Sequence, residues 1–149
     1  MTIVRPAIYN GQELKDYGVD NKTGDIYSFK DKIPKKLKWT HRHRKNIKMS
    51  YPCVSLYDTD VFTWTAKGKL TINLHIIVQE TLVPIPIPEG TTPNEWRTTP
   101  NSIKRWCRKA YIVNHIDHNK ENYKPKNLEW TTIKGNANAY QKHRVENNS

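Results

Sequence analysis

The chain has 149 residues and a formal net charge of +11, from 25 lysines and arginines against 14 acids. This length predicts one domain, or a small core with an appended arm. The positive balance favours a polyanionic partner, usually nucleic acid, rather than a small-molecule substrate; an anionic membrane surface is the alternative. A membrane-spanning helix is excluded, because no apolar run approaches the roughly 20 residues that it needs. The opening residues, MTIVRPAIYN, lack the apolar core of a signal peptide.

The first fifty residues predict a hairpin followed by a basic arm. Apolar and aromatic residues flank an Asp-Asn-Lys-Thr-Gly turn within residues 16–29. Residues 30–48 then hold nine cationic side chains and one acid, with Pro34 against a regular helix. An extended arm that tracks a phosphate backbone or enters a groove fits this composition, and a merely solvated face is the alternative. The candidate DNA-contacting residues here are Lys35, Lys36, Lys38, Arg42, Arg44, Lys45 and Lys48.

Residues 51–83 are typical of a folded body. Residues 53–57 and 61–65 are strand-like, residues 67–69 predict a turn, and residues 70–74 alternate apolar and polar side chains. A short helix is expected next, ending before Pro84. His75 lies in this helix among apolar neighbours, so we expect it to be a core residue. Cys53 and Cys107 form no Cys-x-x-Cys pair, which argues against a cysteine-rich zinc site and favours reduced thiols in a cytoplasmic protein.

Residues 84–101 are rich in proline and threonine and predict a linker or surface loop. A helical turn is expected after it, capped by Ser102. At helical spacing Arg105, Arg108 and Lys109 share one face. That face is a candidate for phosphate contact, and a solvated helix is the alternative.

The stretch from residue 113 to residue 143 carries the most specific pattern. It contains VNHIDHN (113–119), PKNLEWTT (125–132) and GNANAY (135–140). Asn127 follows His115 by 12 residues (127 − 115), and Asn136 follows Asn127 by 9 (136 − 127). A neutral imidazole is the side chain best suited to take a proton from water near pH 7. Amide oxygens can serve a hard cation such as Mg²⁺, although less strongly than carboxylates.

This pattern resembles the active-site motif of the HNH nucleases, in particular the phage and intron-encoded homing endonucleases. The resemblance implies a ββα fold with strands over residues 111–116 and 127–131 and a helix over 133–142. It implies that His115 is the general base, that Asn127 staples the loop between the strands, and that Asn136 binds a metal ion. Asn114 occupies the place of an Asp that also binds the metal in the family.

Two further positions bear on the resemblance. His118 stands where the family commonly has Gly, so we expect Asn119 to take the left-handed conformation of that turn. His75 occupies the place of a histidine at the start of a family helix. Residues 84–101 are an insertion relative to the family.

The sequence therefore predicts an α+β fold with small antiparallel sheets. The expected division is a hairpin and basic arm over residues 1–50, and a nuclease domain over 51–149 with its ββα core at 111–143. The expected function is cleavage of double-stranded DNA with a single Mg²⁺ or Mn²⁺ ion. Two alternatives stay open: an inactive DNA-binding protein, favoured by the neutral Asn114, and an RNA-binding protein, favoured by cations interleaved with Trp. The target sequence, nicking against double-strand cleavage, and the oligomeric state are open as well.

Overall fold

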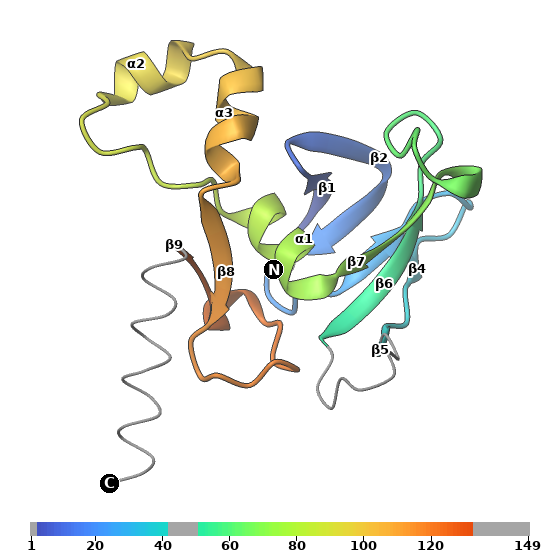
Figure 1. Ribbon diagram of the computed structural model, residues 1–149. Coiled ribbons are helices and arrows are strands. Elements are labelled where there is room, and N and C mark those ends of the chain that lie inside the picture. Colours follow the sequence, from blue (N-terminus) through green and yellow to red (C-terminus); the bar gives the residue numbers. More distant parts are fainter. Residues whose placement is uncertain (1–2, 42–50, 133–149) are drawn as a thin grey trace, which may run out of the picture.

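A computed structural model describes residues 3–41 and 51–132 of the chain (Figure 1). Within these ranges the fold is α+β, as predicted, with three small antiparallel sheets arranged around the helix α1 (Leu74–Leu82). None of the helices in this part of the chain is long and apolar enough to cross a membrane.

The N-terminal sheet has the strand order β1-β2-β3-β4. Its strands are β1 (Val4–Tyr9), β2 (Gln12–Asp20), β3 (Ile26–Ser28) and β4 (Lys35–Lys36). Asn10 and Gly11 join β1 to β2 with φ angles of 52° and 77°, which is the conformation that a tight two-residue hairpin loop requires. The predicted hairpin turn is confirmed: Asp20 accepts hydrogen bonds from the backbone of Lys22 and Thr23 before β3 begins.

The second sheet contains β5 (Thr40–His41), β6 (Pro52–Tyr57) and β7 (Lys69–Asn73), and leads directly into α1. A 3₁₀ turn (Ala66–Gly68) precedes β7, as the sequence predicts. The prediction of a strand over residues 61–65 is wrong. Asp58 accepts hydrogen bonds from the backbone of Asp60 and Val61, which bends the chain into a turn. Phe62 reaches the core from this turn with no exposed surface.

The proline-rich stretch contains a helix that we did not predict. The helix α2 (Pro93–Thr98) begins with a capping box, in which Thr92 and Glu95 each accept a hydrogen bond from the other's backbone. The helix α3 (Asn101–Arg108) follows Pro100, so the expected cap at Ser102 is also wrong. Figure 1 shows both helices above β8 (Tyr111–His115), the first strand of the predicted motif.

The predicted antiparallel pair of the motif is confirmed. β8 pairs with β9 (Leu128–Thr132) in a register that places Asn114 opposite Glu129 and His115 opposite Leu128. A 3₁₀ turn (Pro125–Asn127) leads into β9. The helix expected over residues 133–142 lies outside the described residues.

A single cluster of buried side chains joins the sheets to α1. Ala7, Leu14 and Val19 from the N-terminal sheet belong to it, and so do residues from the second sheet and Leu128 of β9. Ile77 and Val78 of α1 are fully buried within this cluster. Side chains from both sides of residue 50 thus share one core, and the domain boundary expected there stays a prediction.

Candidate active site

His115 lies at the end of β8 in a cluster of three rings. Its side chain faces α1 and is 5% exposed. The ring of His75, from the first turn of α1, lies with its centroid 4.8 Å from that of His115. The ring of Tyr51 stacks on His115 at 5.5 Å and contacts His75 at 4.4 Å. The predicted base thus packs against two rings from other parts of the chain.

His75 is buried, as expected of a core residue, but its surroundings differ from those expected. It is 6% exposed and contacts His115, whereas the sequence suggested only apolar neighbours. Forty residues separate the two histidines (115 − 75), and local patterning carries no signal for such a contact. The only available hint was the correspondence between His75 and a histidine of the family helix.

The electrostatic surroundings keep both imidazoles neutral. Burial lowers the pKa of His115 below its usual 6.5; the Asp117 carboxylate opposes this shift and the Lys120 ammonium adds to it. Burial, with the nearby His115, lowers the pKa of His75 to about 3. Nε2 of His115 and Nδ1 of His75 are buried and have no hydrogen-bond partner among the described residues. Neutral imidazole is the form that can accept a proton.

Asn127 fastens the loop that follows His115. Its Oδ1 accepts from the backbone of Asp117 at 3.0 Å, and its Nδ2 donates to Asp117 Oδ1 at 2.8 Å and to the carbonyl of Asn122 at 2.9 Å. Its own carbonyl accepts from the backbone of Ile116 at 2.8 Å. These four hydrogen bonds hold the loop in place, and the functional role that the resemblance implies for Asn127 stays a prediction. Hydrogen bonds from Asn122, Asn119 and Asn127 lower the pKa of Asp117, which keeps its carboxylate charged.

The tight turn in this loop is centred one residue earlier than expected. His118 has a φ angle of 59°, so it takes the left-handed conformation that we expected of Asn119. Asp117 Oδ1 accepts from the backbone of Asn119 at 2.8 Å, and the His118 backbone donates to the carbonyl of His115 at 3.0 Å. His118 therefore adopts the conformation of the glycine whose place it takes in the motif.

Asn114 is directed away from His115, because neighbouring residues of a strand point to opposite faces. Its Nδ2 donates to Glu129 Oε1 at 2.8 Å. Asn136, the second expected metal ligand, lies outside the described residues, so the convergence of Asn114, His115 and Asn136 stays a prediction. In residues 3–41 and 51–132, no cluster of three or more His, Cys, Asp or Glu side chains is arranged to hold a metal ion.

The start of the basic arm packs against the loop that follows His115. Nε2 of His41 lies 3.1 Å from Glu121 Oε1, and the ring of Trp39 contacts that of Tyr123. Tyr123 in turn donates to Asp25 at 3.0 Å, which ties the loop to the N-terminal sheet. The predicted contacts Lys35, Lys36 and Lys38 are exposed beside this junction, with Lys36 3.4 Å from Asp25. The other four, Arg42, Arg44, Lys45 and Lys48, lie outside the described residues.

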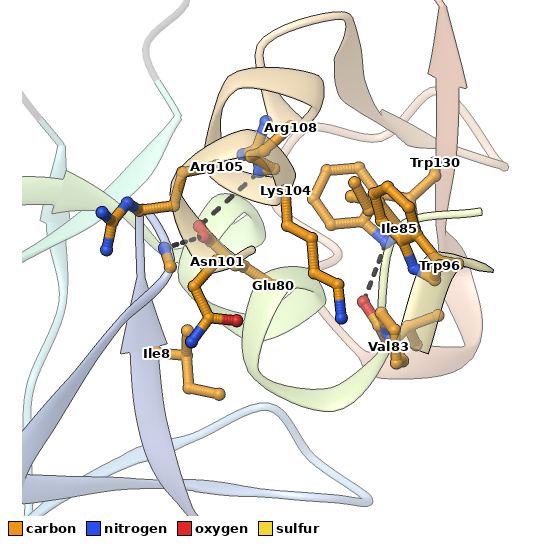
Figure 2. A pocket seen from close by; sticks show the side chains of 12 residues that line it. Ile8, Glu80, Val83, Ile85, Trp96, Asn101, Lys104, Arg105, Arg108 and Trp130 are labelled. Atoms are coloured by element: carbon orange, nitrogen blue, oxygen red, sulfur yellow. Dashed lines mark hydrogen bonds and ion pairs between the residues drawn. The ribbon is translucent and has the colours of Figure 1, made fainter. Parts of the chain in front are cut away.

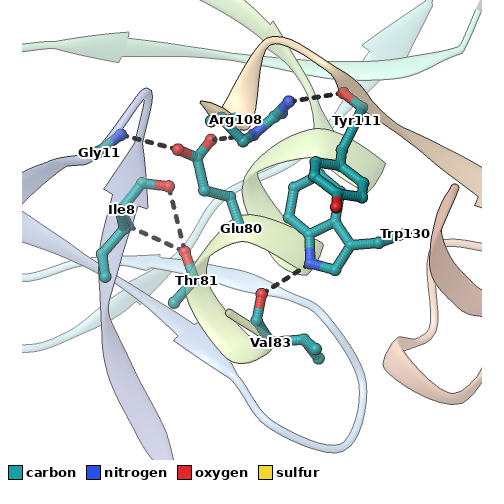
Figure 3. Close-up of polar contacts among 8 residues, drawn as sticks. All are labelled: Ile8, Gly11, Glu80, Thr81, Val83, Arg108, Tyr111 and Trp130. Atoms are coloured by element: carbon teal, nitrogen blue, oxygen red, sulfur yellow. Dashed lines mark hydrogen bonds and ion pairs between the residues drawn. The ribbon is translucent and has the colours of Figure 1, made fainter. Parts of the chain in front are cut away.

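The three cations predicted on α3 have different surroundings. Arg105 and Arg108 line a pocket between α3, α1 and β9 (Figure 2). Lys109 lies outside its lining and is exposed. Arg108 makes internal contacts: its Nη1 donates to the carbonyl of Tyr111 at 3.0 Å, and its Nε lies 3.7 Å from Glu80 Oε2 (Figure 3). Its guanidinium also lies 4.5 Å from the ring centre of Trp130. These contacts give Arg108 a structural role, and phosphate contact by any of the three stays a prediction.

Comparison with known proteins gives one distant structural neighbour. No protein-family model matches the chain, and no curated protein does. A solved structure entitled "DNA binding and cleavage by the HNH homing endonuclease I-HmuI" aligns with 88% of this chain at 27% sequence identity, with a TM-score of 0.44. The alignment covers 50% of that chain, so the present chain spans about half the length of its neighbour.

The residues of the site are suited to proton transfer next to a polyanion. A neutral imidazole packed against His75 and Tyr51 can accept a proton from a water molecule. The Lys120 ammonium, 5.0 Å from the ring centre of Tyr51, brings positive charge to the same place. The exposed cations of the arm extend that charge outward from the loop.

Proposed function

We propose that this chain is an HNH-type endonuclease that hydrolyses phosphodiester bonds of double-stranded DNA. The observation that carries this proposal is that His115 lies next to the loop that Asn127 holds in place. The resemblance to the HNH motif implies a base and a loop clamp at these positions, and the structure has a neutral imidazole beside a loop held by four hydrogen bonds of Asn127. Cleavage requires a general base, whereas DNA binding alone does not.

His115 is the general base in this proposal. Its imidazole takes a proton from the attacking water, while His75 and Tyr51 prevent the ring from rotating away. Asn127 fixes the loop through Asp117 and Asn122, so that the strand end and the loop present one rigid surface to the scissile phosphate. Positioning of this kind lowers the barrier because the reacting groups are already aligned when the DNA binds.

A divalent cation, Mg²⁺ or Mn²⁺, belongs to this type of chemistry. The donor chemistry of Asn114 fits such an ion: its Nδ2 is occupied by Glu129, which leaves its Oδ1 available as an oxygen ligand. Asn114 and Asn136 would hold the ion, and the DNA phosphate would supply the anionic oxygens that hard cations prefer. The bound ion would neutralise charge that develops on the phosphate and on the leaving oxygen.

Cleavage of supercoiled plasmid with and without Mg²⁺ tests the proposal. We expect Mg²⁺-dependent conversion to nicked or linear DNA, and a loss of about 10²-fold or more for His115→Ala, the size typical of a general base. DNA binding by His115→Ala should stay close to that of the wild type. The matched control is His118→Asn, which replaces an exposed histidine by a residue that tolerates the left-handed conformation. Near-normal cutting by His115→Ala would remove this residue from the mechanism.

An inactive DNA-binding protein is the second candidate. The neutral side chain of Asn114 favours it, because two amides hold a divalent ion weakly without a carboxylate. This candidate predicts tight plasmid binding without cleavage by the wild type in either Mg²⁺ or Mn²⁺. Competition by RNA at equal nucleotide concentration separates both candidates from an RNA-binding protein.

A further inference from the structure

A pocket of about 340 Å³ lies between α3, the end of α1 and β9 (Figure 2). Trp96 and Trp130 form part of its wall, together with Val83 and Ile85 from the segment after α1. The polar side chains of Asn101 and Lys104 come from α3. Four of its twelve lining residues, Pro84, Ile85, Trp96 and Asn101, lie in residues 84–101, the segment that is an insertion relative to the HNH pattern. The proposed cleavage mechanism uses none of the lining residues.

The wall around Trp130 is held rigidly. Its indole N–H donates to the carbonyl of Val83 at 2.9 Å, and the Arg108 guanidinium covers the ring at 4.5 Å (Figure 3). Arg108 is itself fixed by Glu80 and by the carbonyl of Tyr111. The pocket is therefore formed before any ligand arrives, as is usual for ligand sites.

Lys104 and Asn101 supply the pocket with polar groups. Nζ of Lys104 lies 5.3 Å from the ring centre of Trp96, and among the described residues no carboxylate is within ion-pair distance of it. Figure 2 shows the ammonium of Lys104 and the amide of Asn101 extending from α3 into the pocket. An unpaired cation, an amide and two indoles together suit a ligand with both a flat ring and a phosphate.

We propose that this pocket binds one unstacked nucleotide of the DNA. The base would stack on an indole of the wall, the Asn101 amide would hydrogen-bond with the edge of the base, and Lys104 would pair with a neighbouring phosphate. Stacking of bases on aromatic side chains, with cations along the backbone, is how proteins bind unpaired nucleotides. The choice of DNA as the source of this nucleotide rests on the proposed nuclease function.

The position of the pocket places this nucleotide close to the cut. Trp130 is paired with Val113, two residues before His115, and all three side chains lie on one face of the hairpin. Two strand residues span about 7 Å, and α1 spans about 12 Å between His75 and Val83. At a rise of about 3.4 Å per nucleotide, the pocket would receive a nucleotide roughly two to four positions from the scissile phosphate.

Two-dimensional NMR of the indole N–H signals tests this inference without any cleavage. The probe is 2′-deoxyadenosine 5′-monophosphate, titrated to about 10 mM into the full chain in EDTA, a range suited to a weak single-nucleotide contact. We expect the signals of Trp96 and Trp130 to shift in a saturable way. Trp64 serves as the internal control, because it is exposed on the connection between β6 and β7, outside the pocket. No saturable shift of Trp96 and Trp130 would overturn the inference.

Two variants test the contacts of the base and of the phosphate separately. Trp96→Ala should weaken nucleotide binding by about fivefold or more, the loss typical of one stacked base. Lys104→Gln should weaken binding of the nucleotide but leave binding of deoxyadenosine, which has no phosphate, unchanged. Lys104 pairs with no acid among the described residues, so its replacement breaks no ion pair there. Equal affinities of wild type and both variants would overturn the inference.

The outcome is distinguishable from that of the nuclease test. Saturable shifts without plasmid cleavage would keep the pocket and remove the nuclease function. Cleavage that depends on His115, with no shift at Trp96 or Trp130, would keep the nuclease and remove the pocket. With the cut site mapped, 2-aminopurine placed two to four nucleotides away should change its fluorescence on binding to wild type more than on binding to Trp96→Ala.

Discussion

His75 and His115 are two single residues whose protonation should affect the stability of the whole fold. Both are buried and both have pKa values below the usual 6.5 for histidine, with that of His75 at about 3. In the unfolded chain each would titrate near 6.5. At a pH between the native-state and the unfolded-state pKa of either histidine, the unfolded chain binds more protons than the native protein. Lowering the pH through this range therefore favours unfolding.

We predict that the free energy of unfolding falls as the pH drops from about 6.5 toward 3. Above 6.5 the two histidines should no longer lower it. A single such group contributes a slope of at most about 1.4 kcal/mol per pH unit. His75→Phe should reduce this slope, because phenylalanine fills the buried site without titrating. The measurement is urea unfolding at pH 7.0, 6.0 and 5.0, with His118→Asn as the exposed control. A slope unchanged by His75→Phe would show that His75 does not titrate in this range on unfolding.

Asn114 is the residue at which the chain departs most from a strong metal site. Its side chain carries no charge, and neither does that of Asn136, so the cation would depend on phosphate oxygens of the DNA. We predict that Asn114→Asp lowers the Mg²⁺ concentration needed for half-maximal cleavage, because a carboxylate adds an anionic ligand. Asn136→Ala should raise that concentration or abolish cleavage.

Metal binding to the free protein checks the same prediction without catalysis. Titration with Mn²⁺, monitored by electron paramagnetic resonance, should show tighter binding to Asn114→Asp than to the wild type. The new carboxylate would be repelled by Glu129, which lies opposite it across the two strands, and this repulsion works against the gain. Combining Asn114→Asp with Glu129→Gln removes the repulsion. Identical Mg²⁺ curves for wild type, Asn114→Asp and Asn136→Ala would mean that neither asparagine is a ligand.

At the scale of secondary-structure elements, Glu80 joins three of them. Its Oε1 accepts from the backbone of Gly11 at 2.7 Å, in the turn between β1 and β2, and its Oε2 lies 3.7 Å from Arg108 of α3. The Glu80 side chain is 8% exposed and that of Arg108 is 18% exposed. The helix α3 is thus attached to the core through a largely buried ion pair.

We predict that Arg108→Met destabilises the fold by about 3–5 kcal/mol, because it leaves the Glu80 carboxylate buried without its partner. The double variant Glu80→Gln with Arg108→Met should recover most of this loss, since glutamine can still accept from Gly11 without a charge. Urea unfolding of the two variants and the wild type measures both effects. A double variant no more stable than Arg108→Met would show that the contacts of the guanidinium with Tyr111 and Trp130, rather than its pairing with Glu80, hold α3 in place.

Elements with strong local signals were predictable, and contacts between distant elements were not. The proline after α1, the alternation of apolar and polar residues in β7, and the turn before β3 are signals that act within a few residues. The roles of His115 and Asn127 were implied by the resemblance to the HNH motif. The prediction of a strand over residues 61–65 was wrong because the turn at Asp58 outweighs the β-propensity of these residues. The helix α2 was missed because the proline-rich composition of residues 84–101 indicated a loop. Thr92 and Glu95 nevertheless have the spacing of a capping box. The contact of His75 with His115, and that of Glu80 with Arg108, depend on tertiary packing alone.

At the scale of the whole molecule, the net charge of +11 is unevenly distributed along the chain. Nine of the 25 cationic residues fall within residues 30–48. The first part of this arm is attached beside the loop of the candidate active site, through His41 to Glu121 and through Trp39 to Tyr123. A DNA strand gripped by the arm would therefore pass close to His115.

This arrangement predicts a steep salt dependence of DNA binding that depends on the arm. Each phosphate contact on duplex DNA adds about 0.9 to the magnitude of the slope of log K against log salt concentration. If Arg42, Arg44, Lys45 and Lys48 make about four such contacts, replacing all four by glutamine should flatten the slope by about 3 to 4. The measurement is fluorescence anisotropy of a labelled duplex from 50 to 300 mM KCl, in EDTA to prevent cleavage.

The matched control replaces four exposed lysines outside the arm, Lys15, Lys22, Lys67 and Lys69, and should change the slope by less than about 1. If the arm variant keeps the wild-type slope, or the control flattens it equally, the arm does not contact the DNA, and the positive charge acts only as a diffuse field.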